Sequence, residues 1–506
     1  MPDPPDWIPD RPPDGPLEPS GEPRQDDRET IPGDAGRGGA PGDAAEPGLR
    51  RAIGLPHATA MVVGTIIGAS IFVQPSEITG DVPSLAGTAL VWIVAGGLTL
   101  MGALVTAELA SMMPESGGVY AFLREAWGRP LGFLWGWAMF WTMHTGIIAA
   151  IAVVFARYLA FLLPLGDTGT RVVAVGAVLL LSAVNYVGVR HGSNLQTAFT
   201  LVKVLAILLM VAVGFALGGS GDAMTAAGPQ PAVSAVGRAA RAPVGTADAL
   251  LGGASAADFL RALVAALFAF GGWHMVTYNA EETVDPRRTV PRALGTGVLL
   301  VTACYVLLNA VYFHVLPLST VVASERVAAD AADAVAGSGG GAFMAALVVF
   351  STFGALAGIV LAGPRVYWAM ARDRMLFRWV GGLHPRYRTP HRAIALQAVW
   401  ASALVLTGTY RALFTRVVYT EWIFFGVMAL GVYVLRARGV EGPYRTWGYP
   451  VTPALFAGAA FAIVVNQVVH DPAESALGLG MVLVGLPVYL FWGRQRRSDR
   501  SEARPP

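Results

Sequence analysis

The stretch GTIIGASIF (Gly64–Phe72) decides how this chain folds, because it interrupts an apolar segment that is otherwise suited to cross a membrane. Gly68 and Ser70 weaken a helix in the middle of this segment, and unwinding there frees backbone N–H and C=O groups. Lipid cannot satisfy such groups, so irregular backbone at this depth must line a cavity or be buried in protein. Close packing of glycines between helices is the alternative interpretation.

A second candidate break, FAFGGWH (Phe268–His274), occurs in the sixth apolar segment. The two segments open the first and the second set of five spans, and paired interruptions at matching positions of two halves indicate the central site of a transporter. Half-helix N-termini offer N–H donors to a carboxylate. Freed carbonyls around Ile66, Phe268 and Gly271 can accept hydrogen bonds from an ammonium. The two breaks together therefore suit the α-carbon end of an amino acid.

Composition predicts an all-α polytopic membrane protein. The chain is 54% hydrophobic and 14% charged, and apolar runs long enough to cross about 30 Å of hydrocarbon recur along it. About twelve spans are expected: Ile53–Val73, Leu85–Met112, Leu131–Leu163, Val172–Val189, Leu195–Phe215, Phe259–Glu281, Ala293–Leu316, Ala342–Ala371, Ala393–Gly408, Leu413–Leu435, Thr452–Val469 and Leu477–Trp492.

The placement of arginine predicts the orientation. The chain has 36 Lys+Arg but a net charge of only +2. Arginines gather in alternate loops, so the positive-inside rule predicts that both termini are cytoplasmic. The expected location of the multi-pass chain is the cell (plasma) membrane. Their spread over many loops leaves no single patch for nucleic acid.

Three regions follow from these patterns. Residues 1–50 are rich in Pro, Gly and charged residues and predict a disordered cytoplasmic tail. Residues 51–494 form the predicted transmembrane domain, and residues 495–506 a basic cytoplasmic tail. Two stretches rich in small residues, Gly218–Ala257 and Ser324–Gly341, are expected to be external loops.

No enzyme chemistry is evident. The eight histidines lack metal-ligand spacing, and no metalloprotease, phosphate-binding or nucleophile motif occurs. Cys304, the sole cysteine, lies in an apolar span, so the chain cannot form an internal disulfide. We therefore predict no catalytic residues, no metal and no cofactor.

Lys203 is the only lysine, and it lies within LQTAFTLVKVLAILLMVAVGF (Leu195–Phe215). Eight residues precede it in this segment, which places it about 12 Å from the nearer helix end. An ionisable residue at such depth usually faces the bundle interior and marks a transport path or a structural ion site. The alternative is a lysine whose side chain snorkels to the interface.

Several longer motifs support a family resemblance that extends from Gly54 to about Tyr489. The chain resembles members of the amino acid–polyamine–organocation superfamily, most closely the L-type amino-acid transporter (light-chain) branch and its bacterial relatives. The resemblance implies the LeuT-type fold, with a 5+5 inverted repeat plus two C-terminal helices, and alternating-access transport of amino acids. The motifs are GTIIGASIF (Gly64–Phe72), AELASMMPESGGVYAF (Ala107–Phe122), FAFGGWHMVTYNAEETVDPRRTVPRA (Phe268–Ala293), RVYWAMARDRML (Arg365–Leu376), YRTPHRAI (Tyr387–Ile394) and YRTWGYPVTP (Tyr444–Pro453).

The resemblance also implies the substrate site. It assigns the carboxylate to the backbone of Gly68, Ala69 and Ser70, the ammonium to the carbonyls of Ile66, Phe268 and Gly271, and a gating role to the ring of Phe268. Gly272, Trp273 and His274 complete the second break and are predicted to belong to the substrate site as well. His274 either tunes side-chain selection or is a neutral, hydrogen-bonded histidine.

Lys203 matches a lysine that, in sodium-independent members, stands where sodium-coupled relatives bind sodium. Its implied partners are carbonyls near Gly64 and the hydroxyl of Ser351. Glu421 resembles a distal-pocket contact, and it either attracts a cationic side chain, takes up a proton, or is a packing carboxyl. Glu281 and Glu282, near Arg287 and Arg288, are expected to form an inner-gate ion-pair region.

Departures from the family pattern refine these expectations. The usual Gly-Ser-Gly turn is Gly68-Ala69-Ser70 here, which changes the shape of the carboxylate pocket. Gly271 lacks the acid that members preferring cationic amino acids can have, which favours neutral substrates. Animal members join a heavy chain through an external cysteine. This chain has none, so no disulfide-linked heavy chain is expected.

The leading hypothesis is a sodium-independent carrier of neutral L-amino acids in the lipid bilayer, working by exchange or with protons. A carrier of cationic amino acids or polyamines, which would use Glu421, is the same-fold alternative. A membrane sensor that keeps the fold without transporting is the third.

Overall fold

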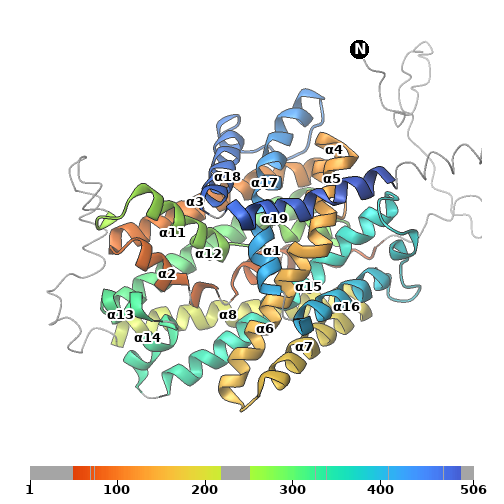
Figure 1. Ribbon diagram of the computed structural model, residues 1–506. Coiled ribbons are helices and arrows are strands. Elements are labelled where there is room, and N and C mark those ends of the chain that lie inside the picture. Colours follow the sequence, from red (N-terminus) through yellow and green to blue (C-terminus); the bar gives the residue numbers. More distant parts are fainter. Residues whose placement is uncertain are drawn as a thin grey trace, which may run out of the picture. The chain divides into compact units, whose positions relative to one another are not determined.

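The computed structural model describes residues 49–68, 70–72, 74–217, 251–324, 326–337, 339–407, 410–470 and 472–491 (Figure 1). The predicted tails therefore lie almost wholly outside the described residues. All regular elements in the described ranges are helices. The one β interaction there is an isolated bridge between Ile53 and Thr283.

The elements follow in this order: α1 (Leu55–Ile66), η1 (Ser70–Phe72), α2 (Gln74–Asp81), α3 (Leu85–Met112), α4 (Val119–Trp127), α5 (Arg129–Ala138), η2 (Met139–Met143), α6 (His144–Leu162), α7 (Asp167–Val187), α8 (Val189–Leu217), α11 (Ala256–Ala269), η4 (Trp273–Glu282), α12 (Pro286–Val315), α13 (Leu318–Ala323), α14 (Val327–Ala336), α15 (Gly340–Arg372), η5 (Arg378–Gly381), α16 (His391–Thr407), α17 (Tyr410–Ala437), α18 (Val451–His470) and α19 (Pro472–Leu483).

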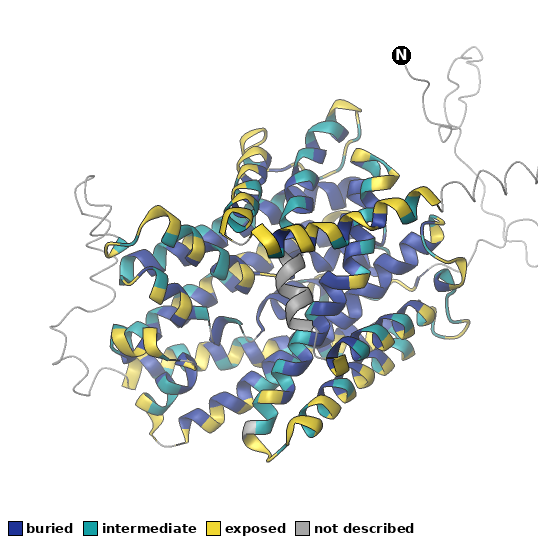
Figure 2. Cartoon of the chain, viewed as in Figure 1, coloured by how far each residue is buried: buried dark blue, intermediate teal, exposed yellow. Residues whose placement is uncertain are grey.

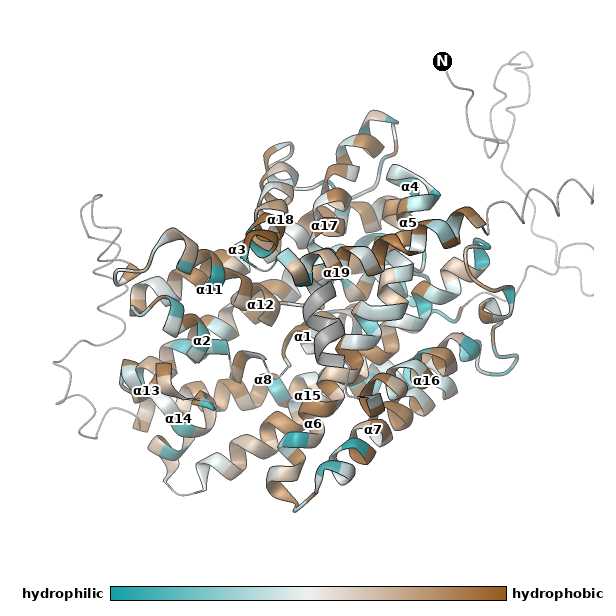
Figure 3. Cartoon of the chain, in the orientation of Figure 1, coloured by the Kyte–Doolittle hydropathy of each residue, from teal (hydrophilic) through white to brown (hydrophobic). Residues whose placement is uncertain are grey.

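The prediction of an all-α polytopic membrane protein is confirmed. Ten described helical segments are long and apolar enough to cross a membrane. The two remaining predicted spans correspond to α1 with η1 and to α16, which are too short or too interrupted to count among the ten. Figure 3 shows apolar residues along the spans and hydrophilic residues at helix ends and in loops.

The order of the helices is that of the LeuT-type fold. The first five spans are α1 with η1, α3, α5 with α6, α7 and α8; the next five are α11 with η4, α12, α15, α16 and α17. Equivalent members of the two sets pack on each other, because α1 contacts η4, α3 contacts α12 and α6 contacts α15. The last two helices, α18 and α19, pack on α17.

Burial separates central helices from peripheral ones. Of the 18 consecutive residues that form the most apolar stretch of α15, 78% are buried. The corresponding share is 22% in α8 and in the segment Pro472–Phe491. Figure 2 shows the same contrast, with exposed residues concentrated on α7, α18 and α19. Those apolar, exposed faces are suited to contact lipid.

One expectation about the loops is wrong. The stretch Ser324–Gly341 contains α14, which packs on α15 and α8. Its alanines are good helix formers, and Asp333 at its end accepts a hydrogen bond of 2.7 Å from the backbone N–H of Gly341. The small residues thus build a helix that covers the bundle. Most of the other predicted loop, Gly218–Ala257, lies outside the described residues.

Loops that hold arginines meet at one end of the bundle. The N–H groups of Ala52 and Ile53 donate to the Glu282 carbonyl at 2.8 and 3.0 Å, and the Gly117 N–H donates to the Tyr278 carbonyl at 3.3 Å. We call this end the arginine-rich side; it is the side predicted to be cytoplasmic.

Candidate functional site: a cavity between two broken helices

The first predicted break is confirmed. Helix α1 ends at Ile66, Ile67 has extended backbone (φ −72°, ψ 94°), and η1 begins at Ser70. Ala69, a predicted carboxylate contact, lies outside the described residues. The break leaves the carbonyls of the last turn of α1 without partners inside their own helix.

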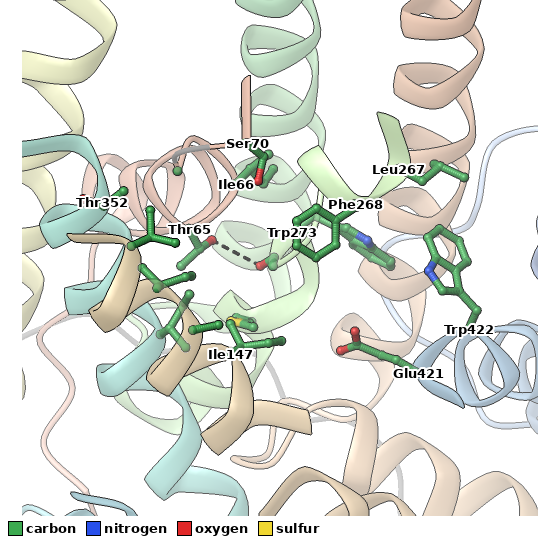
Figure 4. A pocket seen from close by; sticks show the side chains of 18 of the residues that line it. Thr65, Ile66, Ser70, Ile147, Leu267, Phe268, Trp273, Thr352, Glu421 and Trp422 are labelled. Carbon is green, nitrogen blue, oxygen red and sulfur yellow. Dashed lines mark hydrogen bonds between the residues drawn. The ribbon is translucent and has the colours of Figure 1, made fainter. Parts of the chain in front are cut away.

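The second predicted break is confirmed as well, and it contacts the first. Helix α11 ends at Ala269 and η4 begins at Trp273. Gly272 between them has φ +92°, and a Cβ there would lie 3.2 Å from the Thr65 carbonyl oxygen. The Thr65 hydroxyl lies 3.1 Å from the Gly272 carbonyl oxygen (Figure 4). Only glycine combines this conformation with so close an approach.

Tyr305 on α12 joins both breaks. Its hydroxyl lies 3.2 Å from the Ile66 carbonyl and 3.0 Å from the Ala269 carbonyl. Sequence reasoning did not select this residue, because a tyrosine in an apolar span has no distinguishing local pattern. The Ile66 carbonyl has a second lone pair, so it can still accept a hydrogen bond from a ligand.

A cavity of about 330 Å³ lies between the breaks. The predicted residues that line it are Ile66, Gly68, Ser70, Phe268, Gly271, Gly272, Trp273 and Glu421. Sequence reasoning missed the rest of the wall: Thr65, Ile147, Ala150, Ile151, Val154, Arg157, Leu267, Met275, Thr352, Ile359, Trp422 and Phe425. Apolar side chains from α6, α11, α15 and α17 therefore make up much of the lining.

Glu421 and His274 occupy different positions relative to this cavity. Glu421 lines it, and Figure 4 shows Phe268 and Trp273 lying between the α1 break and Glu421. His274 is buried behind the wall, with its ring against Trp135, Trp273 and Phe425. Its Nε2 lies 3.6 Å from Oε1 of Glu421, so it touches the carboxyl rather than the cavity.

Lys203 does not snorkel. Its side chain is 1% exposed, and Nζ donates to the Gly64 carbonyl at 3.1 Å and to the Ile67 carbonyl at 2.8 Å. Ser351 of α15 does not add to this contact as implied; its hydroxyl donates instead to the Gly68 carbonyl at 3.2 Å. Three carbonyls around the α1 break are thus satisfied by side chains from α8 and α15.

Ion pairs lie on the arginine-rich side, around the end of η4. Arg365 and Glu282 are fully buried and form a two-bond pair of 2.7 and 3.0 Å. Glu281 pairs with Arg372 at 3.1 Å. The expectation of an ion-pair region at Glu281 and Glu282 therefore holds, but its partners are arginines of α15 and not Arg287 or Arg288.

A second cluster on this side links α4 to the end of α15. Arg124 pairs with Asp373, and with Glu115 at 3.0 Å. The Tyr120 hydroxyl donates to Asp373 at 2.6 Å. Burial and the neighbouring Asp373 carboxylate raise the pKa of Tyr120, so this hydroxyl remains a donor at physiological pH.

In the part of the chain that the structure describes, no group of three or more His, Cys, Asp and Glu side chains is arranged to hold a metal ion. Two broken helices that face each other across a cavity inside a helical bundle define a secondary transporter.

Comparison with known proteins agrees with this class. The sequence profile of the amino acid permease family matches residues 53–490. The chain is 30% identical to the serine/threonine exchanger SteT of Bacillus subtilis, with 89% of this chain and 98% of that protein covered. It is 29% identical to the Asc-type amino acid transporter 1 of Mus musculus (88% and 82% covered) and 30% identical to the large neutral amino acids transporter small subunit 2 of Homo sapiens (88% and 81%). The chain belongs to the amino acid permease family. It is a multi-pass membrane transporter and not an enzyme.

Proposed function

We propose that the protein transports neutral L-amino acids by alternating access without sodium, as an exchanger or together with protons. The observation that supports this most directly is the cavity between the α1 and α11 breaks. The residues predicted to contact a carboxylate, Gly68 and Ser70, line it, as do those predicted to contact an ammonium, Ile66, Phe268 and Gly271. Ala69 stays a predicted contact.

The side-chain part of the cavity supports a neutral substrate. It is bounded by Ile147, Ile151, Met275 and Phe425, and Gly271 places no acid near the ammonium position. The relatives support the same class, since one is named a serine/threonine exchanger and another a transporter of large neutral amino acids.

The contacts of Lys203 support independence from sodium. Unwound carbonyls at a half-helix end are the groups that bind sodium in coupled transporters of this design. Here the Lys203 nitrogen lies within hydrogen-bonding distance of two of them, the carbonyls of Gly64 and Ile67.

The alternative function is a carrier of cationic amino acids or polyamines. It is supported by Glu421, whose carboxyl lines the cavity. A cationic substrate would gain an ion pair there. The apolar surroundings and the relatives' names favour the neutral class.

The orientation and partners of the carrier are also proposals. The meeting of arginine-rich loops on one side supports cytoplasmic termini. A stand-alone carrier is supported by Cys304, which is buried in α12 with 2% exposure and thus unsuited to an external disulfide.

Uptake of labelled amino acids into proteoliposomes tests this function. We expect uptake of L-serine, L-leucine or both, unchanged when choline replaces sodium and stimulated by internal amino acid or by an inward proton gradient. Uptake confined to L-arginine, L-lysine or polyamines would support the alternative. Binding without any flux would support a sensor.

A further inference from the structure

A second cavity, of about 260 Å³, lies beside the first, and Arg157 of α6 lines both. Its wall includes Phe72 of η1, Tyr158 of α6, Arg326 at the start of α14, and Met344 and Val348 of α15. We call it the outer cavity and the first one the central cavity. Neither the resemblance nor the relatives' names assign it a role.

The outer cavity lies beyond the α1 break, away from the arginine-rich side. Along α6, Arg157 follows Val154, a central-cavity residue, by three positions, or about 4.5 Å of helix rise. Because Arg157 lines both cavities, its side chain lies between the outer cavity and the predicted carboxylate position.

The η1 turn forms the boundary between the two cavities. Ser70 at its start lines the central cavity, while Phe72 at its end lines the outer cavity. An anion bound to Arg157 thus lies next to the turn whose N–H groups are predicted to receive the carboxylate of the substrate.

The other charged side chains around the outer cavity are engaged with protein groups, so Arg157 is the cation that can bind a ligand there. Arg326 pairs with Asp330 at 3.4 Å, and Asp330 also accepts from the Ser324 hydroxyl at 2.5 Å. Asp333 is engaged by the Gly341 N–H. Arg157 is exposed and forms no ion pair with any carboxylate that the structure describes. A guanidinium in this state binds carboxylates well, because two N–H groups match the two oxygens.

We propose that Arg157 forms an outer subsite that binds the α-carboxylate of an incoming amino acid before the η1 turn takes it into the central cavity. The inference rests on the proposed function and adds a recognition step to it. Such a site raises the local concentration of anionic groups and the rate of entry. It also disfavours ligands that bear only positive charge.

Initial-rate uptake of L-serine into proteoliposomes, with substrate added on the side of Arg157, tests the subsite. In Arg157→Gln we expect the KM to rise about tenfold with kcat nearly unchanged, which matches about 1.4 kcal/mol of lost binding. Arg157→Lys keeps the charge but not the two-bond geometry, so its KM should lie between those of the parent and Arg157→Gln. The control is Arg171→Gln, since Arg171 is an exposed arginine on α7 that lines neither cavity; its KM should not change.

Ethanolamine is serine without its carboxylate. Its inhibition of serine uptake therefore distinguishes recognition of the carboxylate by Arg157 from a general change in the shape of the site. Because Arg157 reads the carboxylate, the inhibition constant of ethanolamine should stay the same or improve in Arg157→Gln. Equal weakening of serine and ethanolamine would overturn the proposal, as would an unchanged KM for serine. If Arg157→Gln does not fold, an ionic-strength series on the parent decides: kcat/KM for serine has to fall as salt rises.

Anionic lipid is the other source of a carboxylate- or phosphate-like group. A KM for serine that depends on the anionic-lipid content of the vesicles in the parent, and not in Arg157→Gln, would overturn the substrate assignment. If the parent protein transports another amino acid and not serine, the same KM comparison is made with that amino acid. A parent without any amino-acid uptake would overturn the proposed function, and this inference with it.

Discussion

The side-chain nitrogen of Lys203 on α8 donates a 2.8 Å hydrogen bond to the carbonyl of Ile67, the residue at which α1 unwinds. The same nitrogen reaches the Gly64 carbonyl one turn earlier, at 3.1 Å. Lys203 thus connects a helix of the first repeat to the end of the broken helix. A movement of the break during transport has to change these two bonds.

Replacing Lys203 with alanine should lower turnover by about tenfold or more, which corresponds to about 1.4 kcal/mol. Two buried carbonyls lose their donor, and each unsatisfied group costs about 1–3 kcal/mol. Uptake by the parent should not change when choline replaces sodium. Leu201→Ala is the control, because Leu201 lies on the same helix and is 59% exposed. Normal turnover in a folded Lys203→Ala protein would show that the contact is dispensable.

Tyr305→Phe should slow transport by about three- to tenfold while the protein stays folded. It removes the one hydroxyl that bridges Ile66 and Ala269, so the two breaks keep the Thr65–Gly272 contact but lose this second link. The matched control is Tyr312→Phe on the same helix. Tyr312 is also buried, but its hydroxyl has no hydrogen-bond partner among the described residues. Rates of exchange and melting temperatures in detergent measure both variants; equal behaviour of the two would refute a bridging role.

Gly272→Ala should impair transport and lower the free energy of unfolding by about 1–3 kcal/mol. The residue has φ +92°, and the added methyl would face the Thr65 carbonyl oxygen at 3.2 Å. Gly295→Ala is the comparison, because a Cβ there has nothing within 4 Å. If both alanine variants transport like the parent, the close approach of the breaks is not required.

The sequence was sufficient to locate both breaks, because glycine-rich interruptions act locally. It could not supply the contacts across the breaks, since Thr65 and Gly272 are 207 positions apart and Tyr305 and Ile66 are 239 apart. The partner of Glu282 could not be predicted for the same reason. Arg287 and Arg288 are near in sequence but exposed in the first turn of α12, whereas Arg365 arrives from α15.

The side-chain half of the site was also beyond sequence reasoning. Ile147, Ile151 and Val154 are ordinary apolar residues of a span, and only packing of α6 against α15 turns them toward the cavity. Arg157 was passed over because an arginine near a helix end has a simpler explanation at the membrane interface.

Glu421→Gln should leave uptake of neutral amino acids within about threefold of the parent. The carboxyl lies in a largely apolar wall and has His274 Nε2 at 3.6 Å, so a neutral amide of equal size fits the same place. Parallel uptake of L-serine and L-arginine measures the effect. Strong arginine uptake by the parent that disappears in the variant would identify Glu421 as an ionised reader of cationic side chains.

Glu282→Ala should destabilise the protein strongly, by about 3–5 kcal/mol, because it leaves the Arg365 guanidinium buried without its partner. Both side chains are fully buried and joined by bonds of 2.7 and 3.0 Å. The matched control is Glu441→Ala, whose pair with Arg445 spans 2.9 Å with side chains 72% and 66% exposed. It should change stability by less than about 1 kcal/mol. Melting temperatures in detergent compare the two.

Removing both partners, in Glu282→Leu with Arg365→Met, should recover part of the lost stability, since no charge is then left unpaired. A double variant as unstable as Glu282→Ala would show that packing around η4, rather than the unpaired charge, accounts for the loss.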